Sequence, residues 1–214
     1  MINKEPHPRG RVVRDVVAVF ELDGCIANNT WRKARLESDP KSYYEAAKDD
    51  PSFEVGKALV RAHLEQGDFL IFASQRPFST ADATSKWIQD QFGGILPFHD
   101  FTILMRRDDD ARTELELKKE FAQFILDMAQ KEKLTIANVY DPNPEVVDAY
   151  GAAGLNASIL NDAGLQARKG GEPEPVTDVA FTDTPEAVRP QQPRTQVLVS
   201  CSNTSIPGFD PRHL

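Results

Sequence analysis

The chain has 214 residues, and its 25 Lys and Arg against 33 Asp and Glu give a formal net charge of -8. The surplus of acid argues against broad, charge-driven binding of nucleic acid, which needs clustered Lys and Arg. No membrane segment is expected, because the longest apolar run near the start, Val16 to Phe20, is far shorter than the roughly 20 residues of a span. Two distant cysteines and four scattered histidines predict neither a disulfide framework nor a zinc site. Any metal must therefore be bound by oxygen ligands.

Short apolar runs alternate with segments of helical period between Val16 and Leu160. This alternation predicts an α/β fold, in which a parallel sheet of about five strands is buried by helices on both faces. The strands are expected at Val16–Glu21, Phe69–Ala73, Phe101–Met105, Leu134–Tyr140 and Ala157–Leu160.

Four helices are expected between these strands, each burying one apolar stripe on the sheet. They are predicted from Pro51 to Gly67, from near Ser79 to Gly93-Gly94, around Leu117 to Met128, and from about Pro144 to Gly154.

Residues 28–50 separate the first strand from the first helix and are too many for a βα loop of roughly 2–6 residues. They predict a small helical insert, in which Trp31, Tyr43 and Tyr44 pack against the domain. Arg32 of this insert is expected more on a solvated helix face than in contact with a substrate.

The two ends of the chain differ from the middle. Residues 1–15 are expected to be an N-terminal extension and residues 16–168 the domain. Seven of the 15 prolines fall in residues 169–214, which predicts an extended, Pro-rich arm. Its apolar patch, Val197 to Val199, is suited to adding a strand to a neighbouring sheet. A protein partner, or a second copy of the chain, is therefore expected to bind through the arm.

Two carboxylates lie two residues apart where the first strand ends, in the run Glu21-Leu22-Asp23-Gly24. The carboxyl ends of parallel strands meet at one edge, where open α/β sheets bind ligands. Acids are also common at turns that have no function, so this pair alone does not establish a site.

Polar side chains follow the later strands at the same edge. A hydroxyl and a guanidinium end the second strand, an ammonium lies in the helix after the third, and a carboxylate ends the fourth. Together with the acid pair they predict a phosphate and Mg²⁺ site, in which oxygens bind the cation and cationic groups bind phosphoryl oxygens. These four residues are Ser74, Arg76, Lys118 and Asp141.

The ordered set resembles the haloacid dehalogenase superfamily of phosphatases, and more closely the phosphatase module of phage-type polynucleotide kinase/phosphatases. The matching segments are AVFELDGCIANNTWR, IFASQRP, ELELKKEF and NVYDPNPEVVDAYGAAGL. The likeness spans about Val16 to Leu160 and implies a three-layer, Rossmann-like sandwich with a small helical cap at residues 28–50.

The resemblance also implies roles for the six residues at the sheet edge. The first acid occupies the nucleophile position, the second is the general acid/base, and three residues bind the substrate phosphate. The implied sets are Glu21 and Asp23 for catalysis, Ser74, Arg76 and Lys118 for substrate, and Glu21, Asp23 and Asp141 for Mg²⁺.

Four positions depart from the family pattern: Glu21 replaces its nucleophilic Asp, Cys25 a Thr, Gln75 a Gly, and Pro142 the second acid of the last motif. In-line attack on phosphorus is sensitive to position, and a misplacement of about 1 Å can cost roughly 10²-fold. The added methylene of Glu21 moves the carboxylate by more than that, and Pro142 offers no side-chain ligand. Weak or no turnover is expected, with a weakened Mg²⁺ site.

Two functions follow from this pattern. The first is a catalytically degenerate phosphatase fold from a phage, located in the host cytoplasm or the virion, and retained as a binding or assembly protein whose arm contacts a partner subunit. The alternative is an active Mg²⁺-dependent phosphomonoesterase, in which Glu21 or a water activated by Asp23 attacks. Its substrate would be a phosphate-bearing small molecule such as a nucleotide, or a nucleic-acid 3′-phosphate end, since the acidic charge disfavours long duplexes.

Overall fold

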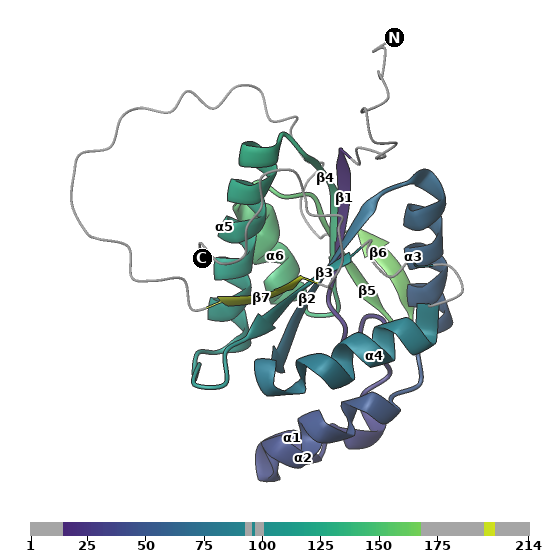
Figure 1. Ribbon diagram of the computed structural model, residues 1–214, viewed down its shortest axis with the longest axis vertical. Coiled ribbons are helices and arrows are strands. Elements are labelled where there is room, and N and C mark those ends of the chain that lie inside the picture. The colour runs from purple at the N-terminus through teal and green to yellow at the C-terminus, as the bar shows by residue number, and fades with distance from the viewer. Residues whose placement is uncertain (1–14, 93–95, 97–100, 168–194, 200–214) are drawn as a thin grey trace, which may run out of the picture.

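The structure is a computed structural model that describes residues 15–92, 96, 101–167 and 195–199. Its strands form a single sheet in the order β6-β5-β4-β1-β2-β3-β7 (Figure 1). The five central strands are parallel, as predicted, and the two edge strands pair antiparallel. The strands are β1 (Val16–Phe20), β2 (Phe69–Pro77), β3 (Phe101–Arg106), β4 (Thr135–Asp141), β5 (Ala157–Asn161), β6 (Gly164–Ala167) and β7 (Thr195–Val199).

Helices cover both faces of the sheet, which gives the predicted three-layer sandwich (Figure 1). One pair, α3 (Glu54–Gln66) and α4 (Ala81–Phe92), lies on one face, and α5 (Glu114–Glu132) and α6 (Pro144–Ala152) lie on the other. None of the helices in the described part of the chain is long and apolar enough to cross a membrane.

The insert consists of short helices, as predicted. Its aromatic residues differ in burial, since Tyr43 is buried whereas 47% of Trp31 is exposed. The prediction that Trp31 packs against the domain is therefore only partly right. The elements of this region are η1 (Thr30–Arg32), α1 (Arg35–Ser38), α2 (Pro40–Glu45) and η2 (Ala46–Asp49), and a further 3₁₀ turn, η3 (Phe78–Thr80), precedes α4.

The central strand β1 packs against both helical layers. Ala18 and Phe20 belong to the core under α3 and α4, whereas Val17 and Val19 belong to the core under α5 and α6. Successive side chains of a strand point to opposite faces, so one apolar run supplies both cores. The continuous apolar strand is the reason that the sequence pattern identified a sheet buried on both sides.

The sheet differs from prediction at its edges and in one strand length. β2 continues to Pro77, which places Ser74 and Arg76 within the strand. β6 was not predicted. The predicted strand at Val197 to Val199 lies in β7 and pairs with β3 of the same chain.

Some predicted features lie outside the described residues. These are the N-terminal extension apart from Asp15, the end of the second helix at Gly93-Gly94, and the arm apart from β7.

Candidate functional site

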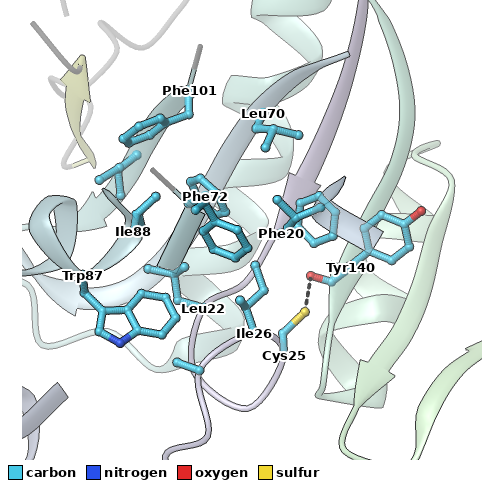
Figure 2. Close-up of a cluster of buried hydrophobic side chains, with 14 of the residues drawn as sticks. Phe20, Leu22, Cys25, Ile26, Leu70, Phe72, Trp87, Ile88, Phe101 and Tyr140 are labelled. Carbon is cyan, nitrogen blue, oxygen red and sulfur yellow. Dashed lines mark hydrogen bonds between the residues drawn. The ribbon is translucent and has the colours of Figure 1, made fainter. Parts of the chain in front are cut away.

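The loop after β1 is anchored by its own apolar side chains. Leu22, Cys25 and Ile26 have no exposed surface and pack beside Phe20 in the core under α3 and α4 (Figure 2). The Cys25 thiol also donates to the carbonyl oxygen of Tyr140 at 3.8 Å, the dashed line in Figure 2. The loop therefore holds its polar residues in fixed positions over the strand ends.

Gly24 and Pro142 pack closely at the strand ends. Gly24 has a φ of +84°, and a Cβ added there would lie 3.3 Å from Cγ of Pro142. Glycine adopts this backbone conformation without strain. The Pro142 ring thus lies against the loop, at the position where the resemblance places a second acid.

The Lys118 ammonium joins two carboxylates beneath the strand ends. It binds the Glu21 carboxylate, and it donates to Asp141 Oδ2 at 3.0 Å and to the carbonyl oxygen of Ala73 at 2.6 Å. The other oxygen of Glu21 accepts from the backbone N–H of Leu22 at 2.8 Å. Both oxygens of Glu21 are therefore engaged inside the protein.

Burial sets the protonation of this pair. It raises the pKa of Glu21 to about 7, against the lowering effect of the Lys118 charge. Burial alone would lower the pKa of Lys118, but Asp141 and Glu21 raise it well above its ordinary value. The lysine is therefore charged, and two carboxylates share its single ammonium.

A second cluster, which we call the arginine clamp, consists of Asp23, Arg32, Asp50 and Arg76. Asp23 Oδ1 accepts from Arg32 Nη2 at 2.7 Å and from Arg76 Nη2 at 2.6 Å. Arg32 Nε also donates to Asp50 Oδ1 at 2.8 Å, and Arg76 Nη2 lies 3.4 Å from Asp50 Oδ2. Although burial raises the pKa of Asp23, the two guanidinium groups outweigh it and lower that pKa overall.

The arginine clamp corrects one prediction and reveals one missed residue. Arg32 has no exposed surface, so the expectation of a solvated face was wrong. The sequence feature that indicated a role for Arg32 was its position as the last residue of the first matched motif. Asp50 was not predicted, because a single acid at the end of an insert resembles any other of the chain's 33 acids.

A pocket of about 760 Å³ lies between the strand ends and the insert. Residues from the sheet edge, from the start of α5 and from the insert line it. Of the predicted site residues, Asp23 lines the pocket. The other five, at most 1% exposed, form its buried surroundings: Glu21, Ser74, Arg76, Lys118 and Asp141.

Ser74 lies in β2 between Ala73, whose carbonyl oxygen accepts from Lys118, and Arg76 of the arginine clamp. Its hydroxyl oxygen accepts from the backbone N–H of Arg76 at 3.3 Å. The structure thus brings all six predicted residues together at one edge of the sheet. It places most of them under the pocket rather than in it.

The carboxylates predicted to bind Mg²⁺ are each engaged by a cation of the chain. Lys118 lies between Glu21 and Asp141, and the arginine clamp holds Asp23. Within the described residues, no three or more His, Cys, Asp or Glu side chains gather in an arrangement that could hold a metal ion. A Mg²⁺ ion at this edge would compete with these cations for the carboxylate oxygens.

Comparisons with known proteins support the fold. No protein-family model and no curated protein matches the sequence. A chain of the "Pnkp1/Rnl/Hen1 complex" is similar in structure, with a TM-score of 0.52 and 19% identity over 71% of this chain and 47% of that one. A chain of the "Pnkp1/Rnl/Hen1 RNA repair complex" gives a TM-score of 0.50 and 20% identity over 70% of this chain and 44% of that one.

A third similar structure is a hydrolase from Streptococcus pneumoniae TIGR4, with a TM-score of 0.41 and 14% identity over 68% of this chain and 92% of that one. The present chain spans less than half of each repair-complex chain. At this level of identity the comparisons bear on fold alone, and they confirm the predicted α/β fold.

Proposed function

We propose that the chain is a catalytically degenerate protein of the haloacid dehalogenase fold, retained to bind a ligand or a partner rather than to hydrolyse phosphate. The observation that carries the proposal is the position of the Glu21 carboxylate. Lys118 holds one of its oxygens, the Leu22 N–H holds the other, and the residue is 1% exposed. A nucleophile needs an oxygen at roughly 3–3.5 Å from phosphorus, and Glu21 is not one of the residues that line the pocket.

The surroundings of Glu21 support the same conclusion. The resemblance places a metal-orienting acid where Pro142 packs on Gly24, and proline has no side-chain oxygen. Arg76 and Lys118, the predicted phosphate-binding cations, are buried and paired with carboxylates. Mg²⁺ binding is accordingly expected to be weak.

The proposal includes a phage setting and a protein partner for the arm, residues 169–214. The motif resemblance to phage-type enzymes supports the first. One feature supports the second: similar chains occur in protein complexes.

Phosphate release tests the proposal. The full chain is incubated with Mg²⁺ and either p-nitrophenyl phosphate or a 3′-phosphorylated oligonucleotide. No release above background is expected. The double variant Glu21→Asp, Pro142→Asp, which shortens the acid and restores a second one, is expected to release phosphate at least about 10²-fold faster.

The variant Glu21→Ala is the control. Robust release by the unmodified chain that Glu21→Ala abolishes would establish the alternative, an active phosphomonoesterase, and would refute the proposal. Its substrate would then be the phosphate-bearing small molecule or nucleic-acid end.

A further inference from the structure

Asp50 is enclosed by N–H donors where the insert meets the sheet edge. Its Oδ1 accepts from Trp31 Nε1 at 2.9 Å and from Arg32 Nε at 2.8 Å. Its Oδ2 accepts from Arg32 Nη2 at 2.5 Å and lies 3.4 Å from Arg76 Nη2. Two guanidinium groups and one indole thus converge on a single carboxylate, and Asp50 is 3% exposed. We call the side chains of Trp31, Arg32 and Arg76 the donor cradle.

The donor cradle has more N–H groups than a carboxylate can accept. A carboxylate has about four acceptor positions, and the four contacts to Asp50 use them. Arg76 has no exposed surface, and within the described residues its Nη1 has no hydrogen-bond partner. A buried donor without an acceptor is costly. The donor cradle therefore suits a larger oxyanion such as phosphate, which offers more oxygens than Asp50 does.

The contacts of Asp50 have the form that an arginine makes with a phosphate group. An arginine binds carboxylates and phosphates through the same pair of parallel N–H bonds. Arg32 holds Asp50 in this way, through Nε to Oδ1 and Nη2 to Oδ2. The donor cradle also lies beside the pocket, because Asp23 binds both of its arginines and lines the pocket. An oxyanion that took these N–H groups would have to replace Asp50.

We propose that Asp50 is an internal competitor at an oxyanion site, where the insert's own carboxylate keeps phosphate from the donor cradle. A group tethered to its site acts at an effective concentration of about millimolar or more, so phosphate must exceed that concentration to bind. Competition of this kind leaves the rate at saturation unchanged, and the double variant Glu21→Asp, Pro142→Asp can still release phosphate. This inference rests on the proposed function and adds a reason for weak phosphate binding.

Isothermal titration calorimetry of the full chain with inorganic phosphate tests the inference, in about 0.15 M chloride to screen exposed charges. The unmodified chain is expected to show no saturable binding up to about 10 mM phosphate. Asp50→Ala removes the competitor and is expected to bind phosphate at one site, at least about tenfold more tightly than that limit. Adding Trp31→Phe to Asp50→Ala removes one N–H of the donor cradle and is expected to weaken this binding by about fivefold.

The matched control is Asp49→Ala, which removes one negative charge at the adjacent, exposed position. It is expected to leave phosphate binding as it is in the unmodified chain. An equal gain from Asp49→Ala and Asp50→Ala would indicate an effect of net charge and refute the inference. Absence of phosphate binding by folded Asp50→Ala would also refute it, as would equally tight binding by the unmodified chain.

Circular dichroism verifies the fold of each variant, because loss of Asp50 leaves two buried guanidinium groups with less compensating charge. Should Asp50→Ala be unfolded, about 10 mM phosphate at constant ionic strength is expected to restore its folded spectrum, since a ligand of the native state stabilises that state. Failure of phosphate to restore the spectrum would refute the inference.

The two proposals fail separately. Phosphate release by the unmodified chain overturns the proposed function and removes the basis of this inference. Absence of both phosphate release by the unmodified chain and phosphate binding by Asp50→Ala overturns this inference alone.

Discussion

At the scale of single residues, Glu21 makes the stability of the chain depend on pH. Its carboxyl is buried with the Lys118 ammonium, and burial raises its pKa to about 7 from an ordinary value of 4.5. Between these pH values the folded chain keeps a proton that the unfolded chain releases. The contribution of Glu21 to stability is therefore full below about pH 4.5 and is lost as the pH rises through 7.

We predict that Glu21→Gln removes this pH dependence, because the amide has a similar shape and does not ionise. Between pH 5 and pH 8 the free energy of unfolding of the variant should rise relative to that of the original chain, by on the order of 2–3 kcal/mol. Urea denaturation at several pH values measures the difference. Parallel pH profiles for the two proteins would show that Glu21 does not titrate in this range.

Asp23 behaves in the opposite way. Although burial raises its pKa, Arg76 and Arg32 lower it overall, below the ordinary value of 3.8. Its contribution to stability is therefore present above about pH 3.8 and is lost as the pH falls through the lowered value. The contributions of Glu21 and Asp23 to stability thus depend on pH with opposite signs. At Glu21 the effect of burial on the pKa outweighs that of the single ammonium, whereas at Asp23 two guanidinium groups outweigh burial.

At the scale of elements, the arginine clamp fastens the insert to the sheet edge. Arg32 and Asp50 come from the insert, whereas Asp23 follows β1 and Arg76 lies in β2. The helices α1 and α2 have 4 and 6 residues, and helices this short are not stable alone in water. Their position depends on these buried ion pairs and on the packing of Tyr43.

We predict that Arg32→Met destabilises the chain by about 3–5 kcal/mol, because it leaves buried carboxylates with less compensating charge. Thermal and urea denaturation measure the loss, and amide hydrogen exchange should show faster exchange over residues 28–50. Arg35→Met is the matched control, since Arg35 is exposed and three positions away, and it should cost less than about 0.5 kcal/mol. Similar costs for both variants would contradict a structural role of the arginine clamp.

At the scale of the whole molecule, an antiparallel strand lies at each end of the five parallel strands. β6 pairs with β5 directly after it in the chain, whereas β7 comes from the arm and pairs with β3 (Figure 1). An open strand edge offers unpaired backbone groups to other chains. The arm thus contributes to the sheet of its own domain.

We predict that a chain ending at Ala167, which lacks β7, self-associates more than the full chain. Size-exclusion chromatography with light scattering at several concentrations measures the change in mass. A chain ending at Val199, which keeps β7, is the control and should match the full chain. Identical masses for all three proteins would show that β7 does not protect the edge.

The sequence by itself located the five parallel strands, the four helices that cover them and the polar residues at the strand ends. Apolar runs and helical spacing depend on neighbours close in the chain, so β1 and α3 could be located from local pattern. A parallel sheet then brings its strand ends to one edge, which is why Glu21, Ser74 and Asp141 were predicted to meet.

Only the tertiary structure decided which charges pair and which side chains reach the pocket. Lys118 and Glu21 are 97 residues apart, and local pattern contains no information on whether two such groups are in contact. Burial of Arg32 likewise depends on how the insert packs over the sheet edge. The charge that a ligand meets in the pocket depends on these pairings, because an ion pair carries less net charge than a cation alone.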